Sequence, residues 1–125
     1  MSLLIVDAAN VVGSVPDGWW RDRRGAAVRL RDGLVLYGRA AGEGAEIVLV
    51  VEGAARGVES VEGVRVESAP GSGDDRIVEL AAEAGAAGVE CTVVTADREL
   101  RRRVEAHGAR CAGPRSVRQP PGERT

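Results

Sequence analysis

The sequence contains no phenylalanine and no lysine, and it has only one tyrosine, two tryptophans and two cysteines. Without phenylalanine, the core has to be built from aliphatic side chains, and nineteen valines, eight leucines and three isoleucines supply them. These 30 branched apolar residues among 125 exclude a chain that is disordered by composition. The abundance of valine favours buried parallel strands and argues against an all-helical fold.

The chain has no excess of positive charge, because 17 arginines stand against 19 acidic residues and the formal net charge is −2. This balance excludes a protein that binds nucleic acid by net charge alone, so any contact with a polyanion has to be local. Arginine suits planar contacts with phosphates and bases, but a GC-rich genome explains the absence of lysine equally well.

Long apolar runs and cysteine clusters are also missing. The first apolar stretch, Leu3 to Val6, reaches Asp7 after four residues, which is too short for a signal-peptide core or a membrane span. Cys91 and Cys111 are too few for a disulfide scaffold and lack the neighbours of a zinc site. We therefore expect buried thiols in a reducing compartment, a cytoplasmic location and no membrane contact.

The pattern of apolar residues predicts alternating strands and helices in one domain of 13.0 kDa. Strands are expected over 2–6, 46–51, 63–67, 91–95 and 109–112. Helices are expected over 20–41, after the loop 70–73 as far as Gly85, and over 97–107. This alternation is typical of a three-layer α/β sandwich with a mostly parallel central sheet. The polar segment 115–125 is expected to be a disordered tail that follows a domain over 1–114.

Five acidic residues follow the predicted strands at their carboxyl ends. They are Asp7, Glu52, Asp74, Asp75 and Asp97. In an open parallel sheet these ends form one crevice, so residues far apart in sequence are expected to converge there. Clustered carboxylates repel one another and raise each other's pKa, which a divalent cation relieves. Oxygen ligands of this kind select Mg²⁺ or Mn²⁺ over Zn²⁺.

Each of these residues also has a purely structural explanation. Asp74, Asp75 and Asp97 stand where they could cap helices, and Asn10 could cap a turn after the first strand. Glu52 could be a solvated residue before a turn. Asp7 is harder to explain, because it follows the most apolar strand directly and no helix start is evident after it.

Four short motifs resemble the NYN branch of the PIN-like nucleases. They are VDAANV at 6–11, VEG at 51–53, GDD at 73–75 and TAD at 95–97, and the likeness spans about residues 2–113. The resemblance implies a PIN-like sheet of order 3-2-1-4-5 between helices. It also implies acidic residues that hold Mg²⁺ or Mn²⁺ and a reaction in which water cuts a phosphodiester bond.

The resemblance also assigns roles to residues. It makes Asp7, Asp75 (or Asp74) and Asp97 catalytic metal ligands, with Asn10 in support. Glu52 is a fifth candidate for the metal site, although many relatives carry Asp at this position and the longer side chain would have to fill the role. No catalytic triad competes with this assignment, because His107, the only histidine, stands at the predicted end of a helix, where a cation is favoured.

Candidates for substrate contact combine aromatic rings with arginines, which stack on bases and pair with phosphates. They are Trp19, Trp20, Arg21, Arg23, Arg24 and Arg98. The alternative is that one tryptophan packs under the long helix and that the arginines are solvated. A second basic cluster consists of Arg98 and Arg101–Arg103, but within it Glu99 with Arg103 and Arg101 with Glu105 have the spacing of ordinary helix pairs.

The sequence therefore predicts a Mg²⁺- or Mn²⁺-dependent ribonuclease, expected to be an endonuclease acting on single-stranded RNA. One alternative keeps the acidic site but hydrolyses small nucleotides, since a nearly neutral chain offers little positive surface to a long polymer. Another is a non-catalytic module that binds RNA or a protein, with the carboxylates acting only as caps. The oligomeric state and the existence of a protein partner stay open.

Overall fold

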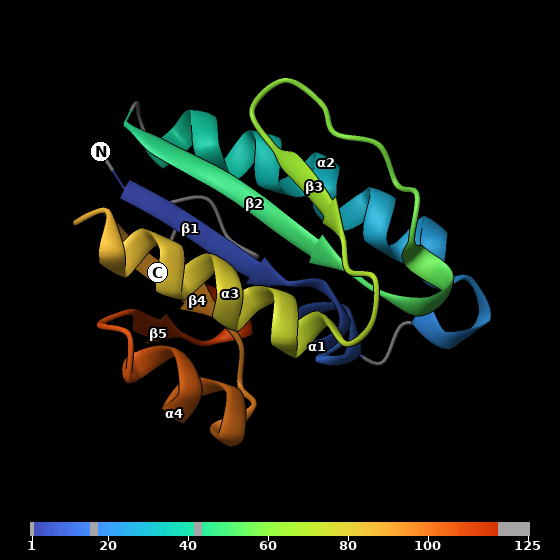
Figure 1. Ribbon diagram of the computed structural model, residues 1–125. Coiled ribbons are helices and arrows are strands. Elements are labelled where there is room, and N and C mark those ends of the chain that lie inside the picture. The colour runs from blue at the N-terminus through green and yellow to red at the C-terminus, as the bar shows by residue number, and fades with distance from the viewer. Residues whose placement is uncertain (1, 16–17, 42–43, 118–125) are drawn as a thin grey trace.

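The computed structural model describes residues 2–15, 18–41 and 44–117, and a five-stranded parallel sheet forms the centre of this part (Figure 1). The strands are β1 (Ser2–Asp7), β2 (Ala45–Val51), β3 (Arg65–Ser68), β4 (Glu90–Val94) and β5 (Arg110–Ala112). Their order is β3-β2-β1-β4-β5, and each neighbouring pair is parallel. The predicted α/β class and the 3-2-1-4-5 order are confirmed.

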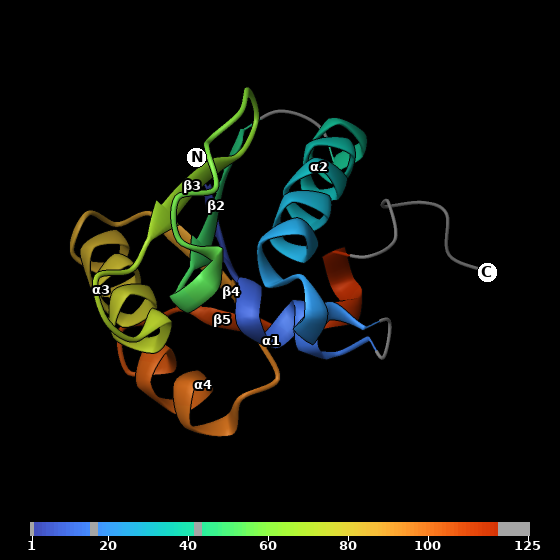
Figure 2. The same ribbon diagram turned by 90° about the vertical axis from the view of Figure 1, so that its right-hand side faces the viewer.

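Helices cover both faces of the sheet and complete the three layers (Figure 2). The α-helices are α1 (Ala8–Gly13), α2 (Arg23–Ala41), α3 (Gly73–Ala86) and α4 (Arg98–Glu105). Three short 3₁₀ helices accompany them within the described residues: η1 (Trp19–Arg21), η2 (Gly53–Ala55) and η3 (Pro114–Val117). Helices α3 and α4 lie on one side of the sheet, and α1 and α2 lie on the other.

The core is split by the sheet into two apolar layers, and alternation along the strands explains this split. Ile5 of β1 and Val48 of β2 pack toward α3 and α4, whereas Val6 and Leu49 pack toward α1 and α2. All four side chains are fully buried. A strand that is covered on both faces needs apolar residues at every position, which explains the unbroken apolar run of β2.

The predicted helix over 20–41 proves to be two elements, and one further helix was not predicted. Helix α2 begins at Arg23 after Asp22, whose Oδ1 accepts a hydrogen bond from the backbone N–H of Gly25 at 2.9 Å. A carboxylate at this position favours a new helix start. Helix α1 has only six residues, which is too few for a helical period to be visible in the sequence.

The boundary predicted for the tail lies too early. Pro114–Val117 form η3, and the side chain of Val117 is buried in the layer that contains α1 and α2. Residues 115–117 therefore belong to the folded domain, because the side chain of Val117 packs in the core. The rest of the predicted tail, 118–125, lies outside the described residues.

The two ion pairs predicted within α4 are replaced by other contacts. Arg102 pairs with Glu99, and Arg103 donates to Asp75 of α3 at 2.9 Å. The guanidinium Nε of Arg101 donates to the carbonyl oxygen of Thr95 at 2.8 Å. Two of these arginines thus join α4 to other segments instead of stabilising the helix surface alone.

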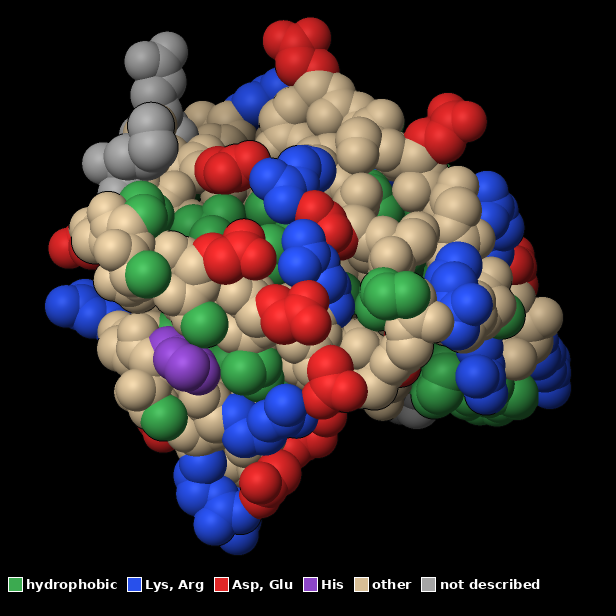
Figure 3. Space-filling model, in the orientation of Figure 1, with side chains coloured by type: hydrophobic (Ala, Val, Ile, Leu, Met, Phe, Trp, Pro, Cys, Tyr) green, Lys and Arg blue, Asp and Glu red, His purple; other side chains and the backbone are tan. Residues whose placement is uncertain are grey.

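The face that carries α3 and β3 shows interspersed acidic and basic side chains (Figure 3). Arg76 of α3 pairs with Glu67 and Glu79, both at 3.0 Å, and Arg65 of β3 pairs with Glu46 and Glu67. This face offers no continuous basic surface to a polyanion. No helix in the described residues has both the length and the apolar character required to cross a membrane.

Two helical glycines give a matched test of the packing. A Cβ added at Gly33 of α2 would meet no atom within 4 Å, whereas one added at Gly85 of α3 would lie 2.5 Å from the carbonyl oxygen of His107. Gly33→Ala should raise the free energy of unfolding by about 1 kcal/mol through helix propensity. Gly85→Ala should lower it by about 1–3 kcal/mol through overpacking. Urea unfolding of both variants checks this, and equal effects would contradict the packing described.

Candidate active site at the carboxyl edge of the sheet

Asp7 stands at the end of the central strand β1, and its carboxylate is the centre of the candidate site. Only 4% of the residue is exposed. Its Oδ2 accepts a hydrogen bond from the hydroxyl of Thr95 at 2.9 Å, and its Oδ1 accepts one from the backbone N–H of Asn10 at 3.4 Å. The second bond makes Asp7 the N-cap of α1. The expectation that no helix starts after Asp7 was wrong, because α1 was not evident in the sequence.

Asn10 and Thr95 connect β1 and α1 to the segment after β4. The side-chain oxygen of Asn10 accepts a hydrogen bond from the backbone N–H of Ala96 at 2.8 Å. The Thr95 hydroxyl, which is fully buried, accepts one from the backbone N–H of Asp97 at 3.1 Å while it donates to Asp7. Asn10 therefore bridges two segments and does not cap a turn. Sequence reasoning missed Thr95, although the TAD motif contained it.

Asp97 caps α4, which was one of the two interpretations of the sequence, and it does so through one carboxylate oxygen. Its Oδ1 accepts hydrogen bonds from the backbone N–H groups of Glu99 and Leu100 at 2.9 and 3.1 Å. The other carboxylate oxygen accepts no hydrogen bond from the described residues. Capping and ligand binding are thus compatible in this side chain, and they were not alternatives.

The structure separates Asp74 from Asp75. Ser72 caps α3 by accepting from the backbone N–H of Asp75 at 3.2 Å, which confirms the expected cap. The carboxylate of Asp75 is exposed and pairs with Arg103 at 2.9 Å. Asp74 is half-buried, and its carboxylate is close enough to Asp7, Asp97 and Glu52 to interact with them electrostatically. Asp74, and not Asp75, therefore faces the other carboxylates.

Glu52, which follows β2, is not the solvated residue that the structural explanation of the sequence described. The residue is half-buried, and its Oε2 accepts a hydrogen bond from the backbone N–H of Gly73 at 3.1 Å. A Cβ added at Gly73 would lie 3.0 Å from Oε1 of Glu52, so a glycine leaves room for this contact. The length of the glutamate side chain lets it span from the end of β2 to the start of α3.

Burial and mutual repulsion raise two pKa values at this edge. Desolvation raises the pKa of Asp7 from 3.8 to about 6, against the hydrogen bonds from Thr95 and Asn10, and the charges of Asp74 and Glu52 raise it further. Desolvation also raises the pKa of Asp74, with repulsion from Asp97 and Glu52 next in size. Carboxylates that are hard to ionise and lie at a strand-end crevice mark a functional-site candidate.

The donor set of this edge fits a hard divalent cation. Aspartate and glutamate oxygens and an asparagine are the ligands that Mg²⁺ and Mn²⁺ prefer, and a cation would relieve the repulsion that raises the pKa of Asp7 and Asp74. Within 2–15, 18–41 and 44–117, no three His, Cys, Asp or Glu side chains lie in a group that could hold a metal ion together. Mg²⁺ needs no such group, because it commonly binds through one or two carboxylates and keeps several waters.

The predicted substrate residues have different surroundings. Trp20 is 54% exposed, and its ring lies edge-on to that of Trp19 with centroids 6.0 Å apart. Arg21 and Arg98 are exposed. Arg24 donates to the carbonyl oxygens of Arg56 and Gly57 at 2.7 and 3.0 Å, so its guanidinium already holds the segment after η2.

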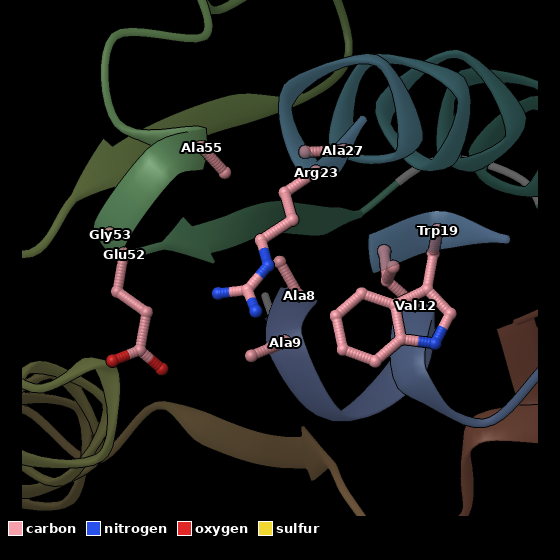
Figure 4. Close-up of a pocket in the computed structure, with 9 residues that line it drawn as sticks. All are labelled: Ala8, Ala9, Val12, Trp19, Arg23, Ala27, Glu52, Gly53 and Ala55. Atoms are coloured by element: carbon pink, nitrogen blue, oxygen red, sulfur yellow. The ribbon is translucent and has the colours of Figure 1, made fainter. Parts of the chain in front are cut away.

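Next to the acidic edge, Trp19 and Arg23 line a pocket of about 260 Å³ (Figure 4). Arg23 lies over the Trp19 ring, 5.5 Å from its centroid. Glu52 lines the opposite wall, so the acidic edge and the pocket share this residue. Trp19 and Arg23 are thus the two predicted substrate residues that line this pocket.

Comparison with solved structures supports the fold. Rae1 (YacP) from Bacillus subtilis matches with a TM-score of 0.78 and 21% sequence identity, over 94% of this chain and 71% of Rae1. A tryptophan-to-leucine mutant of the same protein matches with a TM-score of 0.76 and 20% identity, over 94% of this chain and 72% of the mutant. No family model and no curated protein matches the sequence.

The raised pKa of Asp7 predicts that Asp7→Asn stabilises the metal-free fold at neutral pH. The folded-state pKa of about 6 exceeds the unfolded value of 3.8, so ionisation of Asp7 opposes folding above pH 6. In EDTA at pH 7.5, Asp7→Asn should raise the free energy of unfolding by up to about 3 kcal/mol. Asparagine also retains the cap of α1.

Urea unfolding of the wild type and Asp7→Asn between pH 4 and 7.5 checks this. The advantage of the variant should shrink as the pH falls through 6 toward 4, because Asp7 becomes protonated in the folded wild type and the pH approaches the pKa of 3.8 in the unfolded chain. An advantage that does not change with pH would contradict the burial of an ionised Asp7.

Proposed function

We propose that this protein is a divalent-metal-dependent ribonuclease that cuts single-stranded RNA at the carboxyl edge of its sheet. The observation that carries this proposal is the buried Asp7, whose pKa is raised to about 6 and which interacts with Asp74 and Glu52. A buried carboxylate with further carboxylates close to it is typical of a site that binds a cation for catalysis.

One or two of three carboxylates would hold the cation, and each of the three comes from a different part of the chain. Asp7 comes from the end of β1, Asp74 from the first turn of α3, and Asp97 from the N-cap of α4. When bound, Mg²⁺ or Mn²⁺ supplies positive charge that polarises the phosphoryl group and lowers the pKa of the attacking water. Glu52 adds negative charge at the rim of the same edge.

The remaining residues of the site position these carboxylates. The Thr95 hydroxyl fixes one oxygen of Asp7 by donating a hydrogen bond to it. The same hydroxyl accepts a hydrogen bond from the backbone of Asp97, so it links the end of β1 to the start of α4. Asn10 adds a second link between α1 and Ala96. Preorganised polar contacts of this kind hold charged groups at the reaction centre without reorganisation.

RNA would be held by local contacts, since the net charge of the chain is −2. Trp20 presents an exposed ring for base stacking, and Arg21 and Arg98 are exposed for contact with phosphates. An unpaired strand can place its bases against such aromatic rings, whereas a duplex cannot. This is why single-stranded RNA is the proposed substrate.

The two neighbouring aspartates give a matched test of the active site. Asp74→Asn should lower the rate of manganese-dependent RNA cleavage by at least about 100-fold, because it removes a charge from the cation edge. Asp75→Asn should leave the rate within about threefold, because the Asp75 carboxylate is exposed and its ion-pair partner is Arg103. The measurement is the fragmentation of end-labelled single-stranded RNA over time, with EDTA and Asp97→Asn as controls that abolish it.

Several outcomes would contradict the proposal. RNA cleavage that persists in EDTA, or that Asp74→Asn and Asp75→Asn reduce equally, would exclude the proposed cation edge. Hydrolysis of nucleoside triphosphates without cleavage of RNA would favour a small-nucleotide hydrolase. Clean wild-type protein that binds RNA but cleaves nothing would favour a binding module.

The affinity for Mn²⁺ should increase with pH around the pKa of Asp7. A cation requires the ionised carboxylate, and this form is in the minority below a pKa of about 6. Calorimetry should show a dissociation constant for Mn²⁺ that rises by up to about tenfold when the pH is lowered from 7.5 to 5. Binding near pH 6 should release protons. In Asp7→Asn this dependence on pH should be lost with the binding, and unchanged binding in that variant would contradict the role of Asp7.

A further inference from the structure

The pocket beside the acidic edge combines an apolar interior with one cation and one anion. It is lined mainly by small side chains from α1, the start of α2 and η2, including Ala8, Ala27 and Ala55. Its charged residues are Arg23 and Glu52, which lie on opposite sides of the cavity, with the Glu52 carboxylate directed toward the start of α3 (Figure 4). The volume of about 260 Å³ lies below that of sites for drug-sized ligands and suits a flat group such as one nucleobase.

We propose that this pocket binds a guanine base of the RNA, next to the bond that the acidic edge would cut. The inference rests on the proposed ribonuclease function for its biological setting, but the binding of guanine is a property of the pocket itself. Glu52 lines the pocket and interacts electrostatically with Asp7, so a base in the pocket would lie beside the carboxylates.

Arg23 supplies the hydrogen-bond donors. Its guanidinium lies over the Trp19 ring, and in Figure 4 one terminal nitrogen points toward the side of the pocket that carries Glu52 and the other toward Ala9. Stacking on a ring leaves the in-plane N–H groups of a guanidinium available. Apart from its contact with the Trp19 ring, the Arg23 side chain forms no hydrogen bond and no ion pair with the described residues, Glu52 included. Its N–H groups can therefore bind the adjacent O6 and N7 acceptors of guanine.

Glu52 supplies the acceptors. One carboxylate oxygen, Oε2, accepts from the backbone of Gly73, and this bond fixes the side chain at the pocket wall. An ionised carboxylate only accepts hydrogen bonds, so it selects a base edge that carries donors. Guanine is the RNA base with two neighbouring donors, N1–H and the 2-amino group, beside two acceptors. Adenine, cytosine and uracil each carry only one donor group on this edge, next to at least one acceptor, so none of them offers a carboxylate two neighbouring donors.

Binding of nucleoside 5′-monophosphates in EDTA tests this pocket without metal and without cleavage. Tryptophan fluorescence should report saturable binding of guanosine monophosphate, at least about fivefold tighter than that of the adenosine, cytidine or uridine forms. Arg23→Ala should weaken guanosine binding at least about fivefold. Arg29→Ala removes an equal charge from an exposed position of the same helix outside the pocket lining and should leave the affinity unchanged.

Two further comparisons separate recognition of the base from contact with phosphate. Inosine monophosphate lacks the 2-amino group, so it should bind more weakly than the guanosine form, and Glu52→Gln should abolish this difference. Ribose 5-phosphate should not compete. Equal binding of all four nucleotides, competition by ribose 5-phosphate, or no binding at all would overturn the proposal. Because these assays need no catalysis, guanosine binding without RNA cleavage would reject the nuclease alone, and cleavage without guanosine binding would reject the pocket alone.

Discussion

The burial of a single carboxylate, that of Asp7, is the constraint on which the candidate site depends. β1 is the central strand of the sheet, so the residue at its end is surrounded by neighbouring elements and loses most of its water. A buried carboxylate requires hydrogen-bond partners. The Thr95 hydroxyl and the Asn10 backbone meet this requirement, and the same contacts join α1 to the segment between β4 and α4.

The topology explains why the other carboxylates gather near Asp7. All strands run parallel, so every strand ends at the same edge, and the helices that follow begin there. Asp74 and Asp97 stand at two of these helix starts, where the helix dipole already favours negative charge. The acidic edge is therefore compatible with the folding of the chain, while its repulsion is a free-energy cost that a bound cation would remove.

Much of the fold could be predicted because it follows from patterns that are local in sequence. The apolar run of 46–51 indicates strand β2, and the cap at Ser72 indicates the start of helix α3. The valine content indicates buried parallel strands in general. Helix α1 could not be predicted in this way, since six residues show no helical period. Val117 was also missed, because its burial depends on a space in the core that only the assembled sheet and helices create.

The site was predicted by residue type, but its geometry depends on contacts between distant segments. The choice between Asp74 and Asp75 is decided by the rotation of about 100° between successive helical positions. Thr95 gains its role only because β4 lies next to β1 in the sheet. Glu52 was expected in water because its partner, the backbone of Gly73, is 21 residues away. Arg23 and Glu52 likewise line the same pocket only once the chain has folded.

The central claim is that the strand-end carboxylates hold a divalent cation, and a crystal structure grown with Mn²⁺ tests it most directly. Anomalous diffraction from manganese should give a peak at the carboxyl edge of the sheet, in contact with oxygens of Asp7 or Asp74 and absent in Asp7→Asn crystals. Well-diffracting crystals with no peak at this edge, or with a peak only at surface pairs such as Glu46 and Glu67, would contradict the assignment.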